Sequence, residues 1–577
     1  MNRHIISAMS IAIGIGATSC GTAGIQRYPD APQTPDTIDT YFDLEVRDLY
    51  RPLENDTSAA TLAWVEAERK VTSDYLATIP FRKDIHRRLT ELLDYTKTGM
   101  PWKSRDGYYY FYENDGLRNQ AILYRTKTLG DSAEVFLDPN LLSEDGTVAL
   151  KGVFPDNSNR YTAYTISRNG SDWEEIYVMN NQTKELLPDH VNWAKFTSAA
   201  WHGDGFYYSA YARPENGTEF STENTNHQIY YHKIDTPQSE DRLVYEDPAH
   251  PYYFHNVWVP ESENIMILNI GGNGVGNAMK IKDLRRPDSK WITIEPTQEK
   301  SIDVVDVIGD SIIFMTSYGA PNNRLMTASI SKPERPNWKE LVPNDPEGVL
   351  IGAQSADDKL ILTYQRDAAH HAALYDRKGH KIRDIELPGF GQVGFSSDKD
   401  DKEVFYSFTS FLSPSAIYRY NTETGTSDLY RATEIKDFDM DDYVTEQVFF
   451  TSKDGTKVPM FLTYKKGLER NGKNPVYLYG YGGFNISLNP AFSAQRLLWL
   501  ENGGIYASVN LRGGGEYGET WHEAGTKMQK LNVFNDFIAA AENLIDEGWT
   551  APEYLTIEGG SNGGLLVGAC VNMRPDL

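Results

Sequence analysis

A repeated pair of short strands is the feature of this 577-residue sequence that most restricts its fold. Between residues 102 and 436, an apolar strand, a polar turn and a second strand recur roughly every 50 residues, with no convincing helix between them. The seven units are 108–112 with 121–124, 160–166 with 173–178, 206–211 with 228–231, 265–270 with 278–281, 312–316 with 324–328, 360–364 with 372–375, and 404–408 with 416–420. A single unit leaves two apolar faces bare, and stacking the units in a ring covers them. The spacing therefore predicts a seven-bladed β-propeller over 96–438, with an irregular β-sandwich as the alternative.

After residue 438 the pattern changes to alternating strands and helices. A hairpin is expected at 443–451 and 457–464, followed by a strand and a glycine loop at 475–484 and another strand at 505–511. A helix is expected at 533–547, and a strand at 555–557 leads into a second helix. Alternation of this kind is typical of a doubly wound α/β sheet. Residues 439–577 are therefore expected to form an α/β domain.

The strand at 555–557 runs into a short glycine-rich turn that holds Ser561. The turn is Gly559-Gly-Ser561-Asn-Gly563, which fits the G-x-S-x-G pattern of the nucleophile elbow of an α/β-hydrolase. Such a strand-to-helix turn is so tight that glycine is needed on both sides of the serine. The serine hydroxyl is exposed at a helix N-terminus, where developing negative charge is stabilised. Ser561 is thus the candidate nucleophile, and a glycine-rich turn with a solvent-facing serine is the alternative.

A serine nucleophile also needs oxyanion donors and a general base. The backbone N–H of Asn562 is one candidate donor, and the Tyr481 phenol in the glycine loop is the second, unless Tyr481 merely packs at a strand end. Phe484, at the end of the same loop, is interpreted either as the wall of an apolar pocket or as a core residue. His202 and His522 precede the serine, whereas the base follows it in α/β-hydrolases, so His522 is interpreted as a loop histidine.

The composition argues against two other classes of function. The net charge is −25 and the pI is about 4.9, so the chain lacks the basic surface that a nucleic-acid-binding protein needs. Neither a C-x-x-C nor an H-E-x-x-H pattern is present, so no metal site and no cofactor are expected. The two cysteines are Cys20 and Cys570, and Cys570 is expected to be a small buried thiol rather than half of a disulfide.

The N-terminus is typical of an export signal over 1–20. A short positive region precedes an apolar run at 5–17 that is too short to span a bilayer, and small residues precede Cys20. Cys20 is therefore expected to carry a lipid, which predicts an exported protein that is periplasmic or membrane-anchored. An ordinary secretory signal, an uncleaved anchor and a misread start codon are the alternatives. A polar tether is expected at 21–40, and the segment 41–95 is expected to contain amphipathic helices at 58–76 and 82–93.

Six motifs, in collinear order over nearly the whole chain, resemble those of the prolyl oligopeptidase family. Three lie in the α/β region: Tyr-Gly-Tyr-Gly-Gly-Phe-Asn at 479–485, Asn-Leu-Arg-Gly-Gly-Gly-Glu-Tyr-Gly-Glu-Thr-Trp-His at 510–522, and Gly-Gly-Ser-Asn-Gly-Gly-Leu at 559–565. The others are Phe-Leu-Asp-Pro-Asn at 136–140, Thr-Ser-Phe-Leu-Ser-Pro at 409–414 and Ser-Lys-Asp-Gly-Thr-Lys-Val-Pro at 452–459. The resemblance implies a seven-bladed propeller inserted into an α/β-hydrolase, with the segment 41–95 packed on the hydrolase.

The same resemblance implies a function and a role for each site residue. Members of the family cleave short peptides on the carboxyl side of proline through an acyl-enzyme, and their propeller excludes folded proteins by size. Ser561 matches the nucleophile, Asn562 N–H and Tyr481 O–H match the oxyanion hole, and Phe484 matches a wall of the proline pocket. The expected partners are short proline-containing peptides, and the protein is expected to be a monomer.

Two departures from the family pattern stand out. Pro52 occupies a position where the family usually has tryptophan. The family's catalytic aspartate and histidine correspond to positions beyond residue 577, so the 577-residue polypeptide is expected to be an inactive, incomplete copy. The alternatives are an oligopeptidase B-like or acyl-peptide hydrolase-like enzyme, or a truncated propeller lipoprotein that only binds peptides.

Overall fold

The computed structural model describes residues 27–214, 222–272, 276–286 and 288–577. The expected signal segment with Cys20, and the first part of the expected tether, lie outside these ranges. The chain divides into two compact units, residues 1–85 with 215–222 and residues 86–214 with 223–577. Within the described ranges, every helix is too short or too polar to cross a bilayer.

The first unit contains a hairpin followed by helices. Strands β1 (Ile38–Tyr41) and β2 (Leu44–Arg47) pair antiparallel, and η1 (Arg51–Glu54) and α1 (Ala59–Ala77) follow. Ser58 caps α1 by accepting a 3.1 Å hydrogen bond from the Thr61 backbone N–H. The helix expected at 58–76 is thereby confirmed. The tether expected at 21–40 was drawn too long, because its β-branched and aromatic end already forms β1.

Helix α2 (Arg82–Leu93) confirms the second expected helix. Its C-terminal part belongs to the second unit, where Leu92 is fully buried in a cluster with Leu497 and Leu500. Arg88 in the same part forms a 2.6 Å ion pair with Glu501. These contacts attach the end of the N-terminal segment to helix α3 (Ala494–Glu501).

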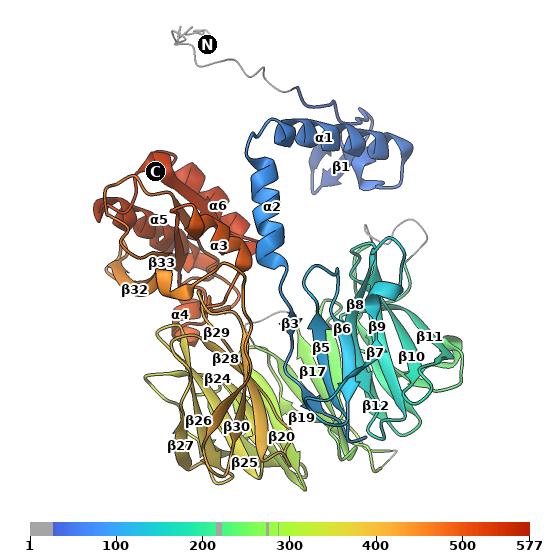
Figure 1. Cartoon of the computed structure of the whole chain (residues 1–577). Helices are drawn as coiled ribbons and strands as arrows, with labels where there is room; N and C mark the ends of the chain where they lie inside the picture. Colours follow the sequence, from blue (N-terminus) through green and yellow to red (C-terminus); the bar gives the residue numbers. More distant parts are fainter. Residues whose placement is uncertain (1–26, 215–221, 273–275, 287) are drawn as a thin grey trace, which may run out of the picture. The chain divides into compact units, whose positions relative to one another are not determined.

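In the described residues between 97 and 431, the strands form six sheets, drawn from blue to yellow in Figure 1. The first has five strands: β3 (Lys97–Thr98), β4 (Trp102–Lys103), β5 (Tyr109–Asn114), β6 (Ile122–Thr126) and β7 (Glu134–Leu137). The second has eight: β8 (Val148–Pro155), β9 (Tyr161–Arg168), β10 (Trp173–Asn180), β11 (Leu186–Lys195), β12 (Ala200–His202), β13 (Gly205–Ala210), β14 (Gln228–Lys233) and β15 (Arg242–Tyr245). Short 3₁₀ turns, η2 (Pro139–Leu141) and η3 (Gln238–Glu240), lie between these strands.

The other four sheets have four antiparallel strands each, in chain order. They are β16 (Phe254–Trp258), β17 (Ile265–Gly271), β18 (Ala278–Asp283), β19 (Ile292–Glu295); β20 (Ile302–Ile308), β21 (Ser311–Thr316), β22 (Arg324–Ser329), β23 (Lys339–Val342); β24 (Val349–Ala356), β25 (Lys359–Arg366), β26 (Ala369–Asp376), β27 (Lys381–Ile385); and β28 (Gln392–Ser396), β29 (Glu403–Thr409), β30 (Ala416–Asn421), β31 (Ser427–Arg431). The turn η4 (Arg335–Asn337) precedes β23.

Each of the seven predicted strand pairs is a hydrogen-bonded antiparallel pair, but the prediction of seven separate blades was wrong. The structure has five blade-sized sheets, and one eight-stranded sheet contains two of the predicted units. The ten-residue strand β11 reaches β13 through a single residue pair, Ala194 with Ala210, and this pair merges the two sets of four strands.

Consecutive sheets stack through shared apolar clusters. Ile267 of β17 packs in one cluster with Phe314 of β21, and Leu374 of β26 packs in another with Tyr406 of β29. The first and last sheets meet at Arg431 of β31, whose guanidinium donates 2.9 Å hydrogen bonds to Thr98 and Glu113. A face-to-face series whose ends meet is the arrangement of a propeller.

The last sheet has the strand order β32-β33-β35-β34-β36, shown in orange and red in Figure 1. Its elements are η5 (Met440–Asp442), β32 (Tyr443–Thr451), β33 (Lys457–Lys465), β34 (Val476–Tyr479), β35 (Ile505–Val509), α4 (Glu519–Glu523), η6 (Lys527–Gln529), α5 (Lys530–Asp546), η7 (Pro552–Tyr554), β36 (Leu555–Glu558) and α6 (Asn562–Met573). β34 runs parallel to both of its neighbours, β35 and β36. The chain adds β35 on one side of β34 and later adds β36 on the other side. This reversal confirms the doubly wound fold.

A buried charged cluster fixes α5 against the loop after β35. Arg512 donates to Asp536 of α5 at 2.6 and 2.9 Å, and it also bonds Asp454 and Ser452 of the β32–β33 turn. The Asp536 side chain is fully buried, and the Arg512 guanidinium holds the pKa of Asp454 down at about 2. Removing one partner of a buried ion pair costs about 3–5 kcal/mol, so this cluster holds the middle of α5 in place.

Candidate active site

Two loops meet at the carboxyl edge of the parallel strands β34 and β36. The register pairs Tyr479 with Glu558, the last residue of each strand. The residues that follow, 480–483 on one strand and 559–562 on the other, therefore leave the sheet side by side. A doubly wound sheet places its ligands at this kind of position, where the strand order reverses.

The turn at Ser561 has the backbone of a strained elbow. Ser561 is exposed and has φ = 53° and ψ = −115°, a conformation that is uncommon for a residue with a side chain. A Cβ added to Gly559 would lie 2.4 Å from the Gly563 carbonyl oxygen, and one added to Gly563 would lie 2.9 Å from the Gly480 oxygen. Only glycine fits at both positions, which explains the motif in this structure.

The Asn562 side chain joins the elbow to the glycine loop. Its amide Nδ2 donates a 2.7 Å hydrogen bond to the Tyr481 carbonyl, and its Oδ1 accepts a 3.3 Å hydrogen bond from the Lys530 ammonium. Lys530 also donates to the Gly482 carbonyl at 2.8 Å. Asn562 is the first residue of α6, so its backbone N–H has no partner within the helix. That N–H is available to a developing oxyanion.

Tyr481 is half-buried beside the elbow. A Cβ on Gly563 would lie 3.8 Å from both Cα and Cδ2 of Tyr481, which places the tyrosine ring next to the turn that holds Ser561. Gly482 has φ = 62°, and a Cβ there would lie 2.3 Å from the Val533 methyl group on α5. The loop is thus packed against both α5 and the elbow. The structure brings the three predicted residues Ser561, Asn562 and Tyr481 together.

Phe484 lines a large cavity between the α/β domain and the sheets at 247–300. The cavity has a volume of about 1250 Å³ and is also lined by Asn562 and Lys530. The Phe484 side chain is 74% exposed, so it is not a core residue, and its φ of 53° again shows strained backbone. The alternative of a core phenylalanine was therefore wrong. The volume exceeds the range of typical small-molecule pockets and suits an extended ligand.

His522 is in helix α4 and buried, so the interpretation as a loop histidine was wrong. Its Nδ1 lies 2.7 Å from the Gly513 carbonyl and 3.1 Å from the Asn485 N–H, which commits that nitrogen to the loop backbone. His250, the other cavity-lining histidine, lies 2.9 Å from Asp247. Among the residues that the structure describes, no histidine or carboxylate is hydrogen-bonded to the Ser561 hydroxyl. None of them is therefore assigned as the general base.

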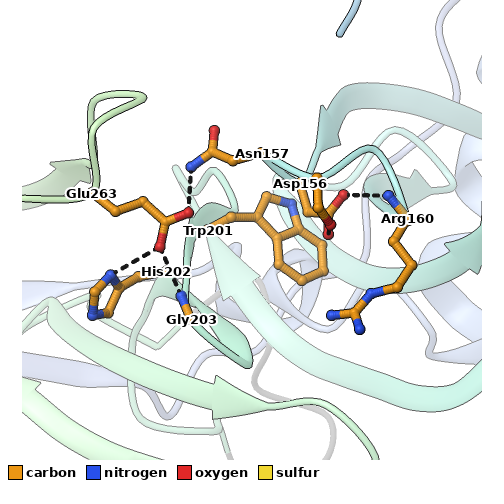
Figure 2. A pocket seen from close by; sticks show the side chains of 8 residues that line it. Asp156, Asn157, Arg160, Trp201, His202, Gly203 and Glu263 are labelled. Atoms are coloured by element: carbon orange, nitrogen blue, oxygen red, sulfur yellow. Dashed lines mark hydrogen bonds and ion pairs between the residues drawn. The ribbon is translucent and has the colours of Figure 1, made fainter. Parts of the chain in front are cut away.

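A smaller hollow of about 420 Å³ lies at the ends of the sheets, around His202 and Glu263. Figure 2 shows that Glu263 contacts Asn157 on one side and His202 and Gly203 on the other. The Asp156 carboxylate accepts a 2.7 Å hydrogen bond from the Arg160 backbone N–H. These polar groups bind one another and connect neighbouring loops, so His202 belongs to a structural contact far along the chain from the elbow.

Cys570 is a free, buried thiol, as predicted, and burial raises its pKa to about 11. Across the described ranges, no group of three or more His, Cys, Asp or Glu side chains is arranged to hold a metal ion.

The residue that sequence reasoning missed is Lys530. It lies three residues before the helix predicted at 533–547, and only the observed helix α5, which begins at Lys530, places the cation in the unfavourable first turn.

Two family profiles match the chain. Residues 29–433 match "Prolyl oligopeptidase, N-terminal beta-propeller domain", and residues 490–577 match "Prolyl oligopeptidase family".

Named relatives and solved structures extend the similarity over nearly the whole chain. The prolyl endopeptidase of Elizabethkingia meningoseptica is 43% identical over 579 residues, covering 100% of this chain and 81% of that protein. The prolyl oligopeptidase ophP of Omphalotus olearius is 36% identical over 92% of this chain and 76% of its own length. A solved prolyl endopeptidase has a TM-score of 0.88 at 32% identity and covers 95% of this chain, with 81% of that structure covered. Prolyl oligopeptidase B from Galerina marginata, solved with a 25-residue macrocyclization substrate, has a TM-score of 0.87 at 29% identity, over 95% of this chain and 80% of that structure.

Proposed function

Because the chain belongs to the prolyl oligopeptidase family, we propose that it is a serine endopeptidase that cleaves short peptides on the carboxyl side of proline. The observation that carries the proposal is the hydrogen bond from the Asn562 side chain to the Tyr481 carbonyl. This bond joins the nucleophile elbow to the loop that offers the second oxyanion donor.

The reaction follows the acyl-enzyme route of serine hydrolases. The Ser561 oxygen attacks the scissile carbonyl carbon and gives its proton to a general base. The carbonyl oxygen becomes an oxyanion, which accepts hydrogen bonds from the Asn562 backbone N–H and the Tyr481 hydroxyl. The C–N bond then breaks, and the amine leaves with the proton. Water hydrolyses the resulting ester and regenerates the Ser561 hydroxyl.

The cavity supplies the selectivity in this proposal. Phe484 presents an exposed ring in the cavity that Asn562 also lines, and such a ring offers an apolar wall to the flat, rigid pyrrolidine of proline. The opposite wall includes Tyr253, Lys280 and residues 295–300, so a substrate has to fit between this part of the sheets and the α/β domain. A space of this size accepts a short extended peptide and excludes a folded protein.

Matched chromogenic peptides test the specificity. The substrates differ only in the residue before the scissile bond, which is proline, alanine or arginine, and a fourth is an N-acylated single amino acid. We expect the full-length protein to show a kcat/KM for the proline peptide about 100-fold above that for the alanine peptide. The pyrrolidine ring of proline buries more apolar area against the pocket than the methyl group of alanine does. A preference for arginine would favour an oligopeptidase B-like enzyme, and a preference for the acylated amino acid would favour an acyl-peptide hydrolase.

We also propose that the protein is exported and attached to a membrane through a lipid on Cys20. The support is the sequence of residues 1–20 alone, with its short apolar run and small residues before the cysteine. Growth with an alkyne-bearing fatty acid should label the wild type and leave a Cys20→Ala variant unlabelled. Equal labelling of both proteins would contradict the proposal.

A further inference from the structure

Lys530 is part of a ring of hydrogen bonds next to the nucleophile. Its ammonium donates to the Gly482 carbonyl at 2.8 Å and to the Asn562 amide oxygen at 3.3 Å. The Asn562 amide nitrogen in turn donates to the Tyr481 carbonyl at 2.7 Å. The ring therefore closes through the Tyr481–Gly482 peptide, and it links the two residues that offer the oxyanion donors.

The position of Lys530 is unfavourable for a lysine in two ways. It is the first residue of α5, where the helix dipole disfavours a positive charge. It is also half-buried, and burial lowers its pKa from the ordinary value. Among the described residues, no carboxylate forms an ion pair with it. Violations of a local preference are expected at functional or strained sites.

Two of the three other lysines that line the same cavity have different partners. Lys300 forms a 2.6 Å ion pair with Glu519, and Lys280 donates to the Tyr245 hydroxyl at 3.0 Å. Lys530 instead donates to the backbone of the glycine loop and to the residue after the nucleophile. Val533, one helical turn further along α5, packs against Gly482. The first turn of α5 thus holds this loop by both a hydrogen bond and a packing contact.

We propose that Lys530 is a positioning residue for the oxyanion hole, which fixes the Tyr481 loop relative to the Asn562 N–H. This inference rests on the proposed function of Ser561 as nucleophile. The oxyanion exists only in the transition state and the tetrahedral intermediate, so the contribution of Lys530 affects kcat and leaves ground-state peptide binding unchanged. The positive charge of the ammonium also stabilises the oxyanion, because Lys530 lies next to the loop and the residue that offer the oxyanion donors, in a partly desolvated site.

The test compares Lys530→Met, Lys530→Arg and the control Lys473→Met, an exposed lysine before β34, in the full-length protein. Five quantities are measured: kcat and KM for a proline peptide, the inhibition constant of a peptide aldehyde ending in proline, the rate at which a fluorophosphonate labels Ser561, and the melting temperature. We expect Lys530→Met to lower kcat about 10- to 100-fold, by analogy with the range for residues that orient metal-ligating side chains. KM should change less than about threefold, whereas aldehyde affinity and labelling rate should fall in parallel with kcat.

The variants separate positioning from a purely structural role. Lys530→Arg keeps a donor at the same place and should recover a large part of kcat, and Lys473→Met should behave as wild type. Equal kinetics for Lys530→Met and Lys473→Met would overturn the inference. A rise in KM together with a lower melting temperature, without loss of aldehyde affinity, would also overturn it, because that pattern indicates structure alone.

The fluorophosphonate rate distinguishes failure of the inference from failure of the proposed function. Labelling depends on the nucleophile and the oxyanion hole but not on a preference for proline. Slower labelling of Lys530→Met in a protein that does not prefer proline would support the role of Lys530 and contradict the proposed specificity. A wild-type protein whose Ser561 is not labelled at all would overturn both.

Discussion

Replacing Ser561 by alanine is expected to lower kcat of the full-length protein on the order of a million-fold, the loss found when a serine nucleophile is removed. The reason is chemical, because alanine keeps Cβ and removes only the oxygen that attacks the substrate. The side chain makes no capping hydrogen bond to α6, and alanine adds no bulk at φ = 53°. The melting temperature and peptide binding should therefore stay close to those of the wild type. Steady-state kinetics with a proline peptide and thermal unfolding measure the two quantities.

Ser493→Ala is the matched control for this variant. Ser493 is also a helix N-cap without a side-chain capping hydrogen bond, at the start of α3. It should retain wild-type kcat. Residual activity of Ser561→Ala above about one part in a thousand of wild type would show that another group is the nucleophile.

Replacing Tyr481 by phenylalanine is expected to lower kcat about 100- to 1000-fold, the effect of removing one oxyanion donor, or about 2.7–4 kcal/mol of transition-state stabilisation. The ring that lies beside Gly563 is retained, so the loop should keep its packing. The Tyr481 carbonyl still accepts the hydrogen bond from Asn562, because that contact involves only the backbone. KM should therefore change little, and kcat should carry the loss.

Tyr479→Phe controls for loss of a phenol at the same edge of the sheet. Tyr479 is the last residue of β34, two residues before Tyr481, and it loses the same hydroxyl in the variant. Its kcat should match that of the wild type. A similar loss in both variants would indicate a general disturbance of the loop, and no loss in Tyr481→Phe would assign the second donor to another group.

The sequence predicts the strands well, because each strand either alternates apolar and polar residues or is continuously apolar, and turn residues bound it on both sides. It does not predict that two of the seven strand pairs share a sheet. That merger depends on one pair, Ala194 with Ala210, between strands whose patterns are ordinary. Pairing between sets of strands is decided by strand length and twist in three dimensions, and a periodicity in the chain does not record it.

The residues of the site were also only partly predictable from the sequence. Ser561 and Asn562 follow from a local motif, since glycines must flank the elbow. Tyr481 was a candidate donor from its glycine loop, and the resemblance to prolyl oligopeptidases favoured that interpretation over a tyrosine packed at a strand end. Lys530 contacts Gly482 and His522 contacts Asn485, which are distant in the chain, so only the folded structure reveals these partners. Phe484 left two interpretations open, because an aromatic side chain is as common in a core as in a pocket wall.

The most direct test of the central claim, that Ser561 is the nucleophile of a proline-directed site, is mass spectrometry of the labelled full-length protein. The protein is treated with a fluorophosphonate after incubation with a peptide aldehyde ending in proline, or with the same aldehyde ending in alanine. We predict that the adduct mass appears on the peptide that contains Ser561, and that the proline aldehyde blocks labelling at concentrations where the alanine aldehyde does not. An adduct on a different residue, or equal protection by both aldehydes, would contradict the account.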